Sequence, residues 1–176
     1  GEGTTLVQIV HPDMAFLVDS VSIAVNQSGR TGHWIVHPLI RVSRDEAGTI
    51  TQVDSAAGTA PSAGKASVVS CILVECTRLA SDPDGEALCR AIESTLLDVR
   101  SAVQDWRAML SRVQLLSAGF TALDGADAAE AKAFLTWLEQ EHFTFLGAQD
   151  LAVEGGQLST VSGTALGILK NPGFQA

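Results

Sequence analysis

The spacing of apolar residues over the first quarter of the chain predicts a strand, a helix and a second strand. The β-branched run Thr4–Val10 is typical of a buried strand. From 15 to 28 the apolar positions recur at helical spacing, and Gly29 supplies a stop. Residues 33–44 predict an edge strand, because Pro38 has no N–H group to donate to a ladder. The apolar face of that strand is predicted to carry Trp34, Val36, Ile40 and Val42.

The middle of the chain predicts a central strand and then one unusually long helix. Residues 45–65 are rich in Gly, Ala, Ser and Thr, which predicts a turn with a loose loop. The run Ala66–Leu79 is apolar on both faces near its middle, as is typical of a central strand. Apolar steps of three and four then continue from 84 to 116, which predicts a helix about 50 Å long. A small sheet cannot cover that length, so the far half of this helix is expected to pack on something else.

After the long helix the pattern predicts one more helix and one more strand. The helix covers about 126–140, the strand covers His142–Val153, and Glu154–Gln157 is predicted to be a hairpin turn. This order predicts the α+β class, as a ferredoxin-like βαββαβ sandwich with an extended second helix and an additional C-terminal helix and strands. Residues 1–120 form the predicted first domain. Residues 121–176 are predicted either to begin the next domain or to complete the first sheet.

Composition and charge narrow the range of partners. The formal net charge is −9, and the 11 Lys and Arg residues form no run, so a nucleic-acid partner is not expected. No apolar run reaches the ~18 residues that a membrane span requires, so no membrane partner is expected either. The cysteines, Cys71, Cys76 and Cys89, lack metal-ligand spacing. They are expected to be small buried hydrophobes, which fits a cytoplasmic location.

The candidate catalytic and metal-binding groups form no known motif. Gly58–Ser67 resembles a phosphate-binding loop, but five residues rather than four separate its glycines, and a strand follows it. His33 and His37 share a strand face about 13 Å apart, which is too far for one ion. Asp13 is suited to cap the first helix, and Asp19 is predicted to lie in mid-helix, so the two carboxylates are not expected to share a site. No catalytic residue, metal ligand or cofactor site is predicted in this chain.

Five stretches of the sequence together resemble one protein family. Their order and spacing match over about Leu6–Leu169, which is nearly the whole chain. They read HPDMAFLVDSV, IVHPLIRVSRDEAG, LLDVRSAVQDWRAM, FLTWLEQEHFTFLG and GTALGIL. They resemble the N-terminal region of the large bacterial NAD-specific glutamate dehydrogenases, which carries ACT-type modules.

The resemblance implies a function that spacing alone does not show. The full-length enzymes convert L-glutamate, NAD and water to 2-oxoglutarate, ammonia and NADH, and their dehydrogenase core lies toward the C-terminus. This chain would be the first ACT-type module, without a cofactor of its own, whereas the parent enzyme binds NAD. ACT modules often bind amino acids and pair side by side. The expected partners are therefore other domains or subunits of the parent dehydrogenase, with an amino-acid effector as a second candidate.

The candidate ligand site is the turn formed by Asp13, Met14, Ala15 and Phe16. Ligand-binding ACT modules generally have glycine where this chain has Phe16, and the family tends to have proline where Ala15 stands. A phenylalanine there would either fill the ligand pocket or point into the core. Two hypotheses follow. The chain is an interaction module that docks through its sheet edge and the far half of its long helix, or it is an allosteric sensor of an amino acid.

Overall fold

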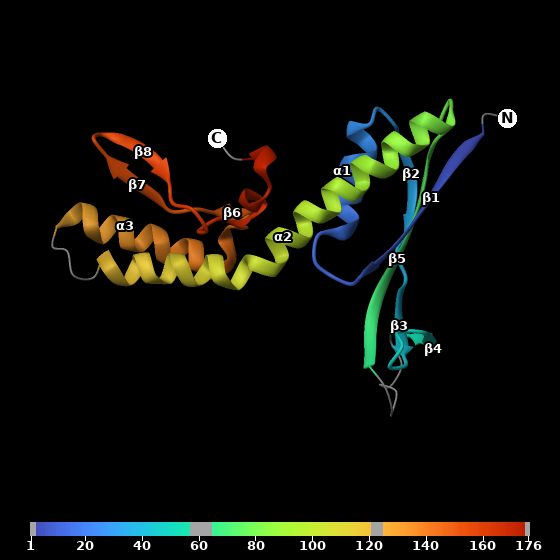
Figure 1. Cartoon of the computed structure of the whole chain (residues 1–176), viewed down its shortest axis with the longest axis horizontal. Coiled ribbons are helices and arrows are strands. Elements are labelled where there is room, and N and C mark those ends of the chain that lie inside the picture. Colours follow the sequence, from blue (N-terminus) through green and yellow to red (C-terminus); the bar gives the residue numbers. More distant parts are fainter. Residues whose placement is uncertain (1–2, 57–64, 121–124, 175–176) are drawn as a thin grey trace. The chain divides into compact units, whose positions relative to one another are not determined.

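The computed structural model describes residues 3–56, 65–120 and 125–174, and Figure 1 shows its elements. The chain forms two compact units, Gly1–Leu96 and Leu97–Ala176, and the division between them falls inside the longest helix. The boundary between the two compact units, after Leu96, therefore lies earlier in the sequence than the predicted domain boundary after residue 120. The reason is that one helix contributes to both units. Where one domain of a longer protein would end and the next begin stays a prediction.

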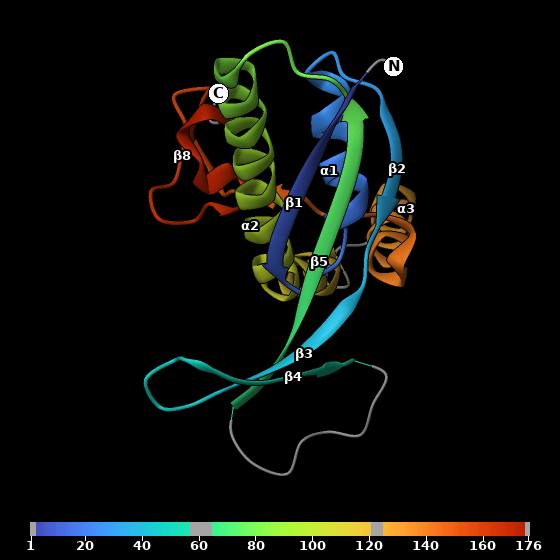
Figure 2. The ribbon, with the colours of Figure 1, turned by 90° about the vertical axis from the view of Figure 1, so that its right-hand side faces the viewer.

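The first unit is built on an antiparallel sheet with β5 (Lys65–Thr77) at its centre. One edge of β5 pairs with β1 (Thr4–Pro12) over all nine residues of that strand. The other edge pairs with β2 (Gly32–Val36) and β3 (Leu39–Arg44), and β4 (Ile50–Ser55) pairs with β3 (Figure 2). The predicted central position of the 66–79 strand is confirmed.

Two helices cover one face of this sheet, and the core lies between them and β5 (Figure 2). They are α1 (Leu17–Gln27) and the first part of α2 (Asp82–Phe120). Their apolar side chains follow the helical spacing of the sequence and meet alternate residues of β5. The buried cluster consists of Leu17, Val21, Ala24, Val25, Ile72, Val74, Cys76, Leu88, Ile92 and Leu96.

The prediction of one edge strand over 33–44 is wrong in its continuity, because the segment forms β2 and β3, which are separated at Pro38. It is also wrong for the place of β3, which lies between β5 and β4 rather than at an edge. The predicted core face is right for Val42, which is 2% exposed, but wrong for the residues of β2. Ile35 packs on the core, whereas Trp34 and Val36 lie on the other face and are 42% and 48% exposed. Both faces of this segment carry apolar residues, so the pattern alone could not show which one meets the helices.

Strand β4 lies in a segment that was predicted to be a loop, so that prediction is wrong for 50–55. The turn before it is confirmed, because the Asp45 N–H donates to Thr49 O at 3.0 Å and the Thr49 N–H donates to the Asp45 carboxylate at 2.8 Å. Most side chains of β4 are exposed. Backbone pairing with β3 rather than burial therefore makes it a strand, and the sequence carries no apolar alternation that would reveal it.

The α+β class and the antiparallel sheet are confirmed, but a complete βαββαβ sheet is not observed. A ferredoxin-like sheet ends with a strand that follows the second helix and lies beside the first strand. Here β5 is the one strand neighbour of β1 among the described residues. The chain instead continues along α2, which is 39 residues long.

The second unit holds the rest of α2 together with short elements. These are α3 (Ala126–Trp137), a π-helical turn (Leu138–His142), β6 (Gly147–Ala148), β7 (Leu151–Glu154), β8 (Gln157–Thr160), β9 (Leu166–Gly167) and 3-10 turns at Ile168–Lys170 and Pro172–Phe174. The described strands pair among themselves, β6 with β9 and β7 with β8. The predicted hairpin is confirmed, because Glu154 pairs with Gln157 across two glycines of positive φ.

The predicted strand over 142–153 is wrong, because only two short strands form there. The apolar residues at its start make ring contacts instead of a ladder. Phe143 packs edge-on against Phe145 at a centroid distance of 5.6 Å, and the Phe145 ring lies 6.4 Å from the Trp106 ring of α2, centroid to centroid.

In the described part of the chain, no helix has the length and apolar character needed to cross a membrane.

The position of the core can be tested with two isoleucines. Replacing Ile72, which is 1% exposed, with alanine should lower the free energy of unfolding by about 2–5 kcal/mol, because a buried cavity remains. The matched change at Ile23 of α1, which is 53% exposed, should cost well under half of that. Denaturant unfolding followed by circular dichroism measures both. Equal losses would contradict the assignment of the core face.

Candidate functional site

Two hydrogen bonds to β5 hold the turn between β1 and α1 in place. The Asp13 N–H donates to Val68 O at 3.1 Å, and the buried Ser70 hydroxyl donates to the Asp13 carboxylate at 2.7 Å. Met14 packs against the core, and Leu17 begins the helix fully buried. The path of the turn is therefore set by the strand beneath it.

Phe16 holds this turn in an unusual backbone conformation. Its φ is +68°, and among the described residues it is the one non-glycine with positive φ. For a side chain with a Cβ atom this left-handed region costs about 1–2 kcal/mol. The turn thus keeps the backbone of a glycine at the position where ligand-binding ACT modules are expected to have one. The side chain is 51% exposed, so of the two expected orientations the one that points into the core is not observed.

The charges near the start of α1 are unfavourable for an anionic ligand. Asp13 does not cap the helix as predicted, because its carboxylate accepts the Ser70 hydroxyl and no side chain caps α1. Asp19 was predicted to lie in mid-helix, but it belongs to the first turn. The positive end of the helix dipole therefore already has an acidic side chain in its first turn. The structure brings Asp13, Met14, Ala15 and Phe16 together in one turn, yet it supplies no basic side chain among them.

The other candidate groups stay scattered. Among the described residues, no group of three or more His, Cys, Asp or Glu side chains is placed to hold a metal ion. Cys76 is buried, as expected, and burial raises the pKa of its thiol. Cys71 is only half-buried and Cys89 is exposed, so the prediction of a buried residue is wrong for Cys89. Most of the segment that resembles a phosphate-binding loop, Gly58–Ser67, lies outside the described residues.

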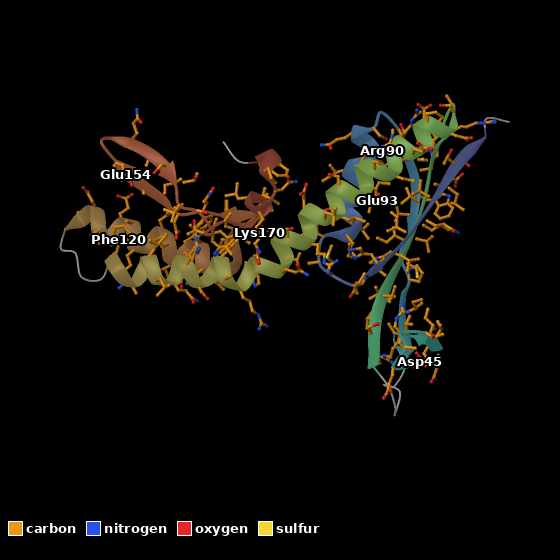
Figure 3. All side chains as sticks on the ribbon, viewed as in Figure 1. Asp45, Arg90, Glu93, Phe120, Glu154 and Lys170 are labelled. Atoms are coloured by element: carbon orange, nitrogen blue, oxygen red, sulfur yellow. The ribbon has the colours of Figure 1, made fainter. Side chains whose placement is uncertain are left out.

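A second organised site lies in the second unit, where the Asp105 carboxylate of α2 holds the 166–170 segment. Its Oδ2 atom accepts the Gly167 N–H at 2.7 Å and lies 2.6 Å from Lys170 Nζ. Figure 3 labels Lys170 in the second unit. The side chain of Asp105 is 15% exposed. The hydrogen bond from Lys170 lowers the pKa of Asp105, and the Gly167 N–H acts in the same direction.

Two glycines allow β6 and β9 to approach each other closely beside the Asp105 contact. Gly147 and Gly167 face each other where β6 pairs with β9. Gly167 has a φ of +61°, and a Cβ atom there would overlap the backbone oxygen of Leu146. A Cβ atom on Gly147 would lie 2.8 Å from the side chain of Leu169. Only glycine therefore fits at 167 without movement of the backbone.

The roles of Asp105, Gly167 and Lys170 were not recognised from the sequence. The first two lie within the family-like strings, LLDVRSAVQDWRAM and GTALGIL, and Lys170 follows directly. The available signals were Asp105 beside the aromatic Trp106 and Gly167 within an apolar string. They did not reveal the contact, because the partners are 62 residues apart.

Comparison with known proteins agrees with the resemblance. The family model described as "Glutamate dehydrogenase, ACT1 domain" matches residues 2–92. The chain is 34% identical to the NAD-specific glutamate dehydrogenase of Halomonas elongata and 29% identical to that of Pseudomonas aeruginosa. Each match covers 94% of this chain and 11% of the relative, so the chain spans about a tenth of the length of these proteins. The chain belongs to the glutamate dehydrogenase ACT1 domain family.

The contact of Asp105 predicts a pH dependence of stability. Because its pKa is lowered in the folded state, the folded protein binds fewer protons than the unfolded one between the two pKa values. The contribution of Asp105 is therefore complete above the unfolded pKa of about 3.9 and is lost as pH falls through the lower folded value. Asp105→Asn should cost about 1–2 kcal/mol near pH 7, and this difference should shrink below about pH 4. Denaturant titrations at several pH values measure it, and a difference that is constant down to acid pH would contradict the assignment.

Gly167 can be compared with Gly163, a second glycine of positive φ. Gly163 has a φ of +76° with open space around it, so Gly163→Ala should cost only the backbone strain, about 1–2 kcal/mol. Gly167→Ala should cost more, because the added methyl group also meets Leu146 O. Thermal unfolding of the two variants checks the order. The steric argument fails if both lose the same stability.

Proposed function

We propose that this chain is a non-catalytic regulatory and interaction module of a large NAD-specific glutamate dehydrogenase. In the parent enzyme, L-glutamate, NAD and water would be converted to 2-oxoglutarate, ammonia and NADH by residues outside this chain. Family membership and the 11% share of the relatives' length support this division of labour. The sequence also contains no G-x-G-x-x-G dinucleotide fingerprint.

The observation that carries the proposal is the exposed apolar surface of α3. This helix of 12 residues has no buried side chain, although Phe134 and Trp137 lie on it, 57% and 44% exposed. Their rings stack at a centroid distance of 6.1 Å, and Trp137 also stacks on His142 at 5.2 Å. Exposed aromatic side chains that form one patch are typical of docking surfaces.

The long helix α2 also exposes apolar side chains. Leu97 is 63% exposed, and Leu115 and Leu116 in its far half are 74% and 59% exposed. The sequence predicted that the far half of this helix packs on something else, and these two leucines are not covered by the described residues. We infer that other domains or subunits of the parent dehydrogenase cover these side chains, since burying each of them would yield about 1–3 kcal/mol before the cost of association.

The test compares one substitution in two settings. Phe134→Lys should hardly change the unfolding of the isolated chain, because the side chain is already exposed there. In the full-length enzyme the same change should lower the thermal stability or the fraction assembled. Ala133→Lys is the matched control, since Ala133 is exposed on the same helix and should be silent in both settings. A Phe134→Lys variant that is silent in both would overturn the docking role, and NADH formation from glutamate and NAD by the isolated chain would overturn the non-catalytic role.

An amino-acid sensor is the alternative, and the conformation of Phe16 favours it. The positive φ and the absence of a side-chain cap leave the first N–H groups of α1 available to a ligand. A ligand at a hundred times its dissociation constant would add about 2.7 kcal/mol to the stability of the isolated chain. A thermal-shift panel of the twenty amino acids, repeated with Phe16→Asp, separates the two hypotheses. A rise with one amino acid that the variant abolishes would support the sensor, and a flat panel supports the interaction module.

A further inference from the structure

One side of α3 carries two carboxylates followed by two aromatic rings. This acidic–aromatic stripe consists of Asp127, Glu130, Phe134 and Trp137. Steps of three, four and three residues place the four side chains on one side of the helix, over about 15 Å of its length. All four are exposed. The stripe is distinct from the half-buried positions of the helix, which follow the same steps one residue later at Ala128, Ala131 and Leu135.

A π-helical turn extends the row of rings by one residue. The turn Leu138–His142 follows α3 directly, and in a π-helix residues five apart in sequence lie one above the other. His142 therefore stacks on Trp137 with an angle of 15° between the rings, and Trp137 stacks on Phe134 with an angle of 17°. The three rings form one nearly parallel row with all three side chains exposed. Single π-helical turns are frequent at functional sites.

The two carboxylates of the stripe have no cation of their own. In the part of the chain that the structure describes, neither Asp127 nor Glu130 forms an ion pair or a side-chain hydrogen bond. They are three residues apart, so their like charges repel one another across one turn of the helix. The basic residue of α3, Lys132, lies on the opposite side of the helix, because it is five residues from Asp127 and two from Phe134. A cation supplied by a partner would relieve this repulsion.

Arginine is the cation that matches both halves of the stripe. Long side chains of a helix lean toward its N-terminus, so the ring of Phe134 leans over the turn that carries Glu130. A guanidinium group is planar, and it can stack on an aromatic ring while it pairs with a carboxylate. The formal charge of −9 opposes the approach of an acidic partner or an anionic surface and favours a basic one.

We propose that the acidic–aromatic stripe docks an amphipathic helix from another domain of the parent dehydrogenase, and that this helix carries arginine beside apolar residues. Its arginine lies at the Glu130 end of the stripe, where it stacks on Phe134, and its apolar side chains cover Trp137. A helix that packs along α3 presents such anchors at steps of three and four residues. This inference rests on the proposed function, because it names the chemistry of the partner that covers α3.

Photo-cross-linking in the full-length enzyme identifies what covers the stripe. With p-benzoylphenylalanine in place of Phe134, irradiation should join α3 to a peptide of another domain that contains arginine, and peptide mass spectrometry identifies it. The same group in place of Lys132, on the opposite side of the helix, is the matched control and should not capture that peptide. The proposal is overturned if position 134 captures no peptide, a peptide without arginine, or a peptide from residues 1–176 of a second copy.

Reversal of the two carboxylates tests the charge of the contact. Asp127→Lys with Glu130→Lys should lower the melting temperature or the assembled fraction of the full-length enzyme. Glu46→Lys with Glu154→Lys changes the net charge by the same amount at two exposed positions elsewhere, and should leave both quantities nearly unchanged. At about 1 M salt, where screening acts over about 3 Å, the difference between the two pairs should largely disappear.

The isolated chain separates the contact from effects on α3 itself. Asp127 lies in the first turn of the helix, so its replacement by lysine also removes a favourable interaction with the helix dipole. The loss of melting temperature in the isolated chain measures this part, and it is subtracted from the loss in the full-length enzyme. Circular dichroism should show that both pairs of variants fold, because the replaced side chains are exposed.

Equal losses from the two pairs of variants, or a loss that salt does not reduce, would overturn the cationic partner. Such a result leaves the proposed function standing if Phe134→Lys still weakens the full-length enzyme. The docking role itself fails if Phe134→Lys is silent there. The two failures are therefore distinguishable, since one is read from the charge variants and the captured peptide and the other from a single aromatic position.

Discussion

The central strand β5 is the constraint on which the first unit depends. Its thirteen residues pair with β1 on one edge and with β2 and β3 on the other, so every backbone ladder of the sheet except that of β4 runs through it. Ile72, Val74 and Cys76 point from it into the core and provide the surface on which both helices pack. Ser70 of the same strand holds the β1–α1 turn through Asp13. The candidate ligand turn is therefore positioned by the core rather than by its own residues.

In the second unit, the helix α2 is the element to which the other segments are attached. Asp105 receives the Gly167 N–H and Lys170, and Arg112 lies 2.7 Å from the Asp150 carboxylate, so acidic and basic groups fasten the C-terminal segment to this helix. Few side chains of the unit are buried: Ala102, Met109, Val113 and Ser117 of α2 are, and α3 contributes none. Ionic contacts and glycine-to-glycine backbone packing thus act beside a small apolar core. A unit held in this way is suited to gain stability from a neighbour.

The β1–α1 turn has a backbone conformation suited to ligand binding but side chains that are not suited to bind an anion. Its backbone at Phe16 has the left-handed conformation that glycine adopts readily, which matches the expectation from ligand-binding ACT modules. Its side chains supply an exposed aromatic ring and carboxylates, with no cation for an amino-acid carboxylate. The backbone geometry of the turn would suit a ligand, but its acidic side chains would repel an amino-acid carboxylate. The charge of the turn therefore supports the interaction role over the sensor role.

The sequence by itself determined the elements whose apolar periods match their burial. These were α1, the central strand, the long helix and the glycine hairpin at 155 and 156, together with the family through its five strings. The first strand also forms as predicted, but it is not the buried strand that its apolar run predicted, because Leu6 and Val10 are 52% and 74% exposed. Only the tertiary structure decided which face of β2 meets the helices, that β4 is a strand, and that 142–153 is mostly not one. It alone brought Asp105 to Gly167 and Lys170, and left the edge of β1 open. The reason is physical: a period in the sequence reports local geometry, whereas a face, an edge or a contact across 62 residues depends on which surfaces the folded chain brings together.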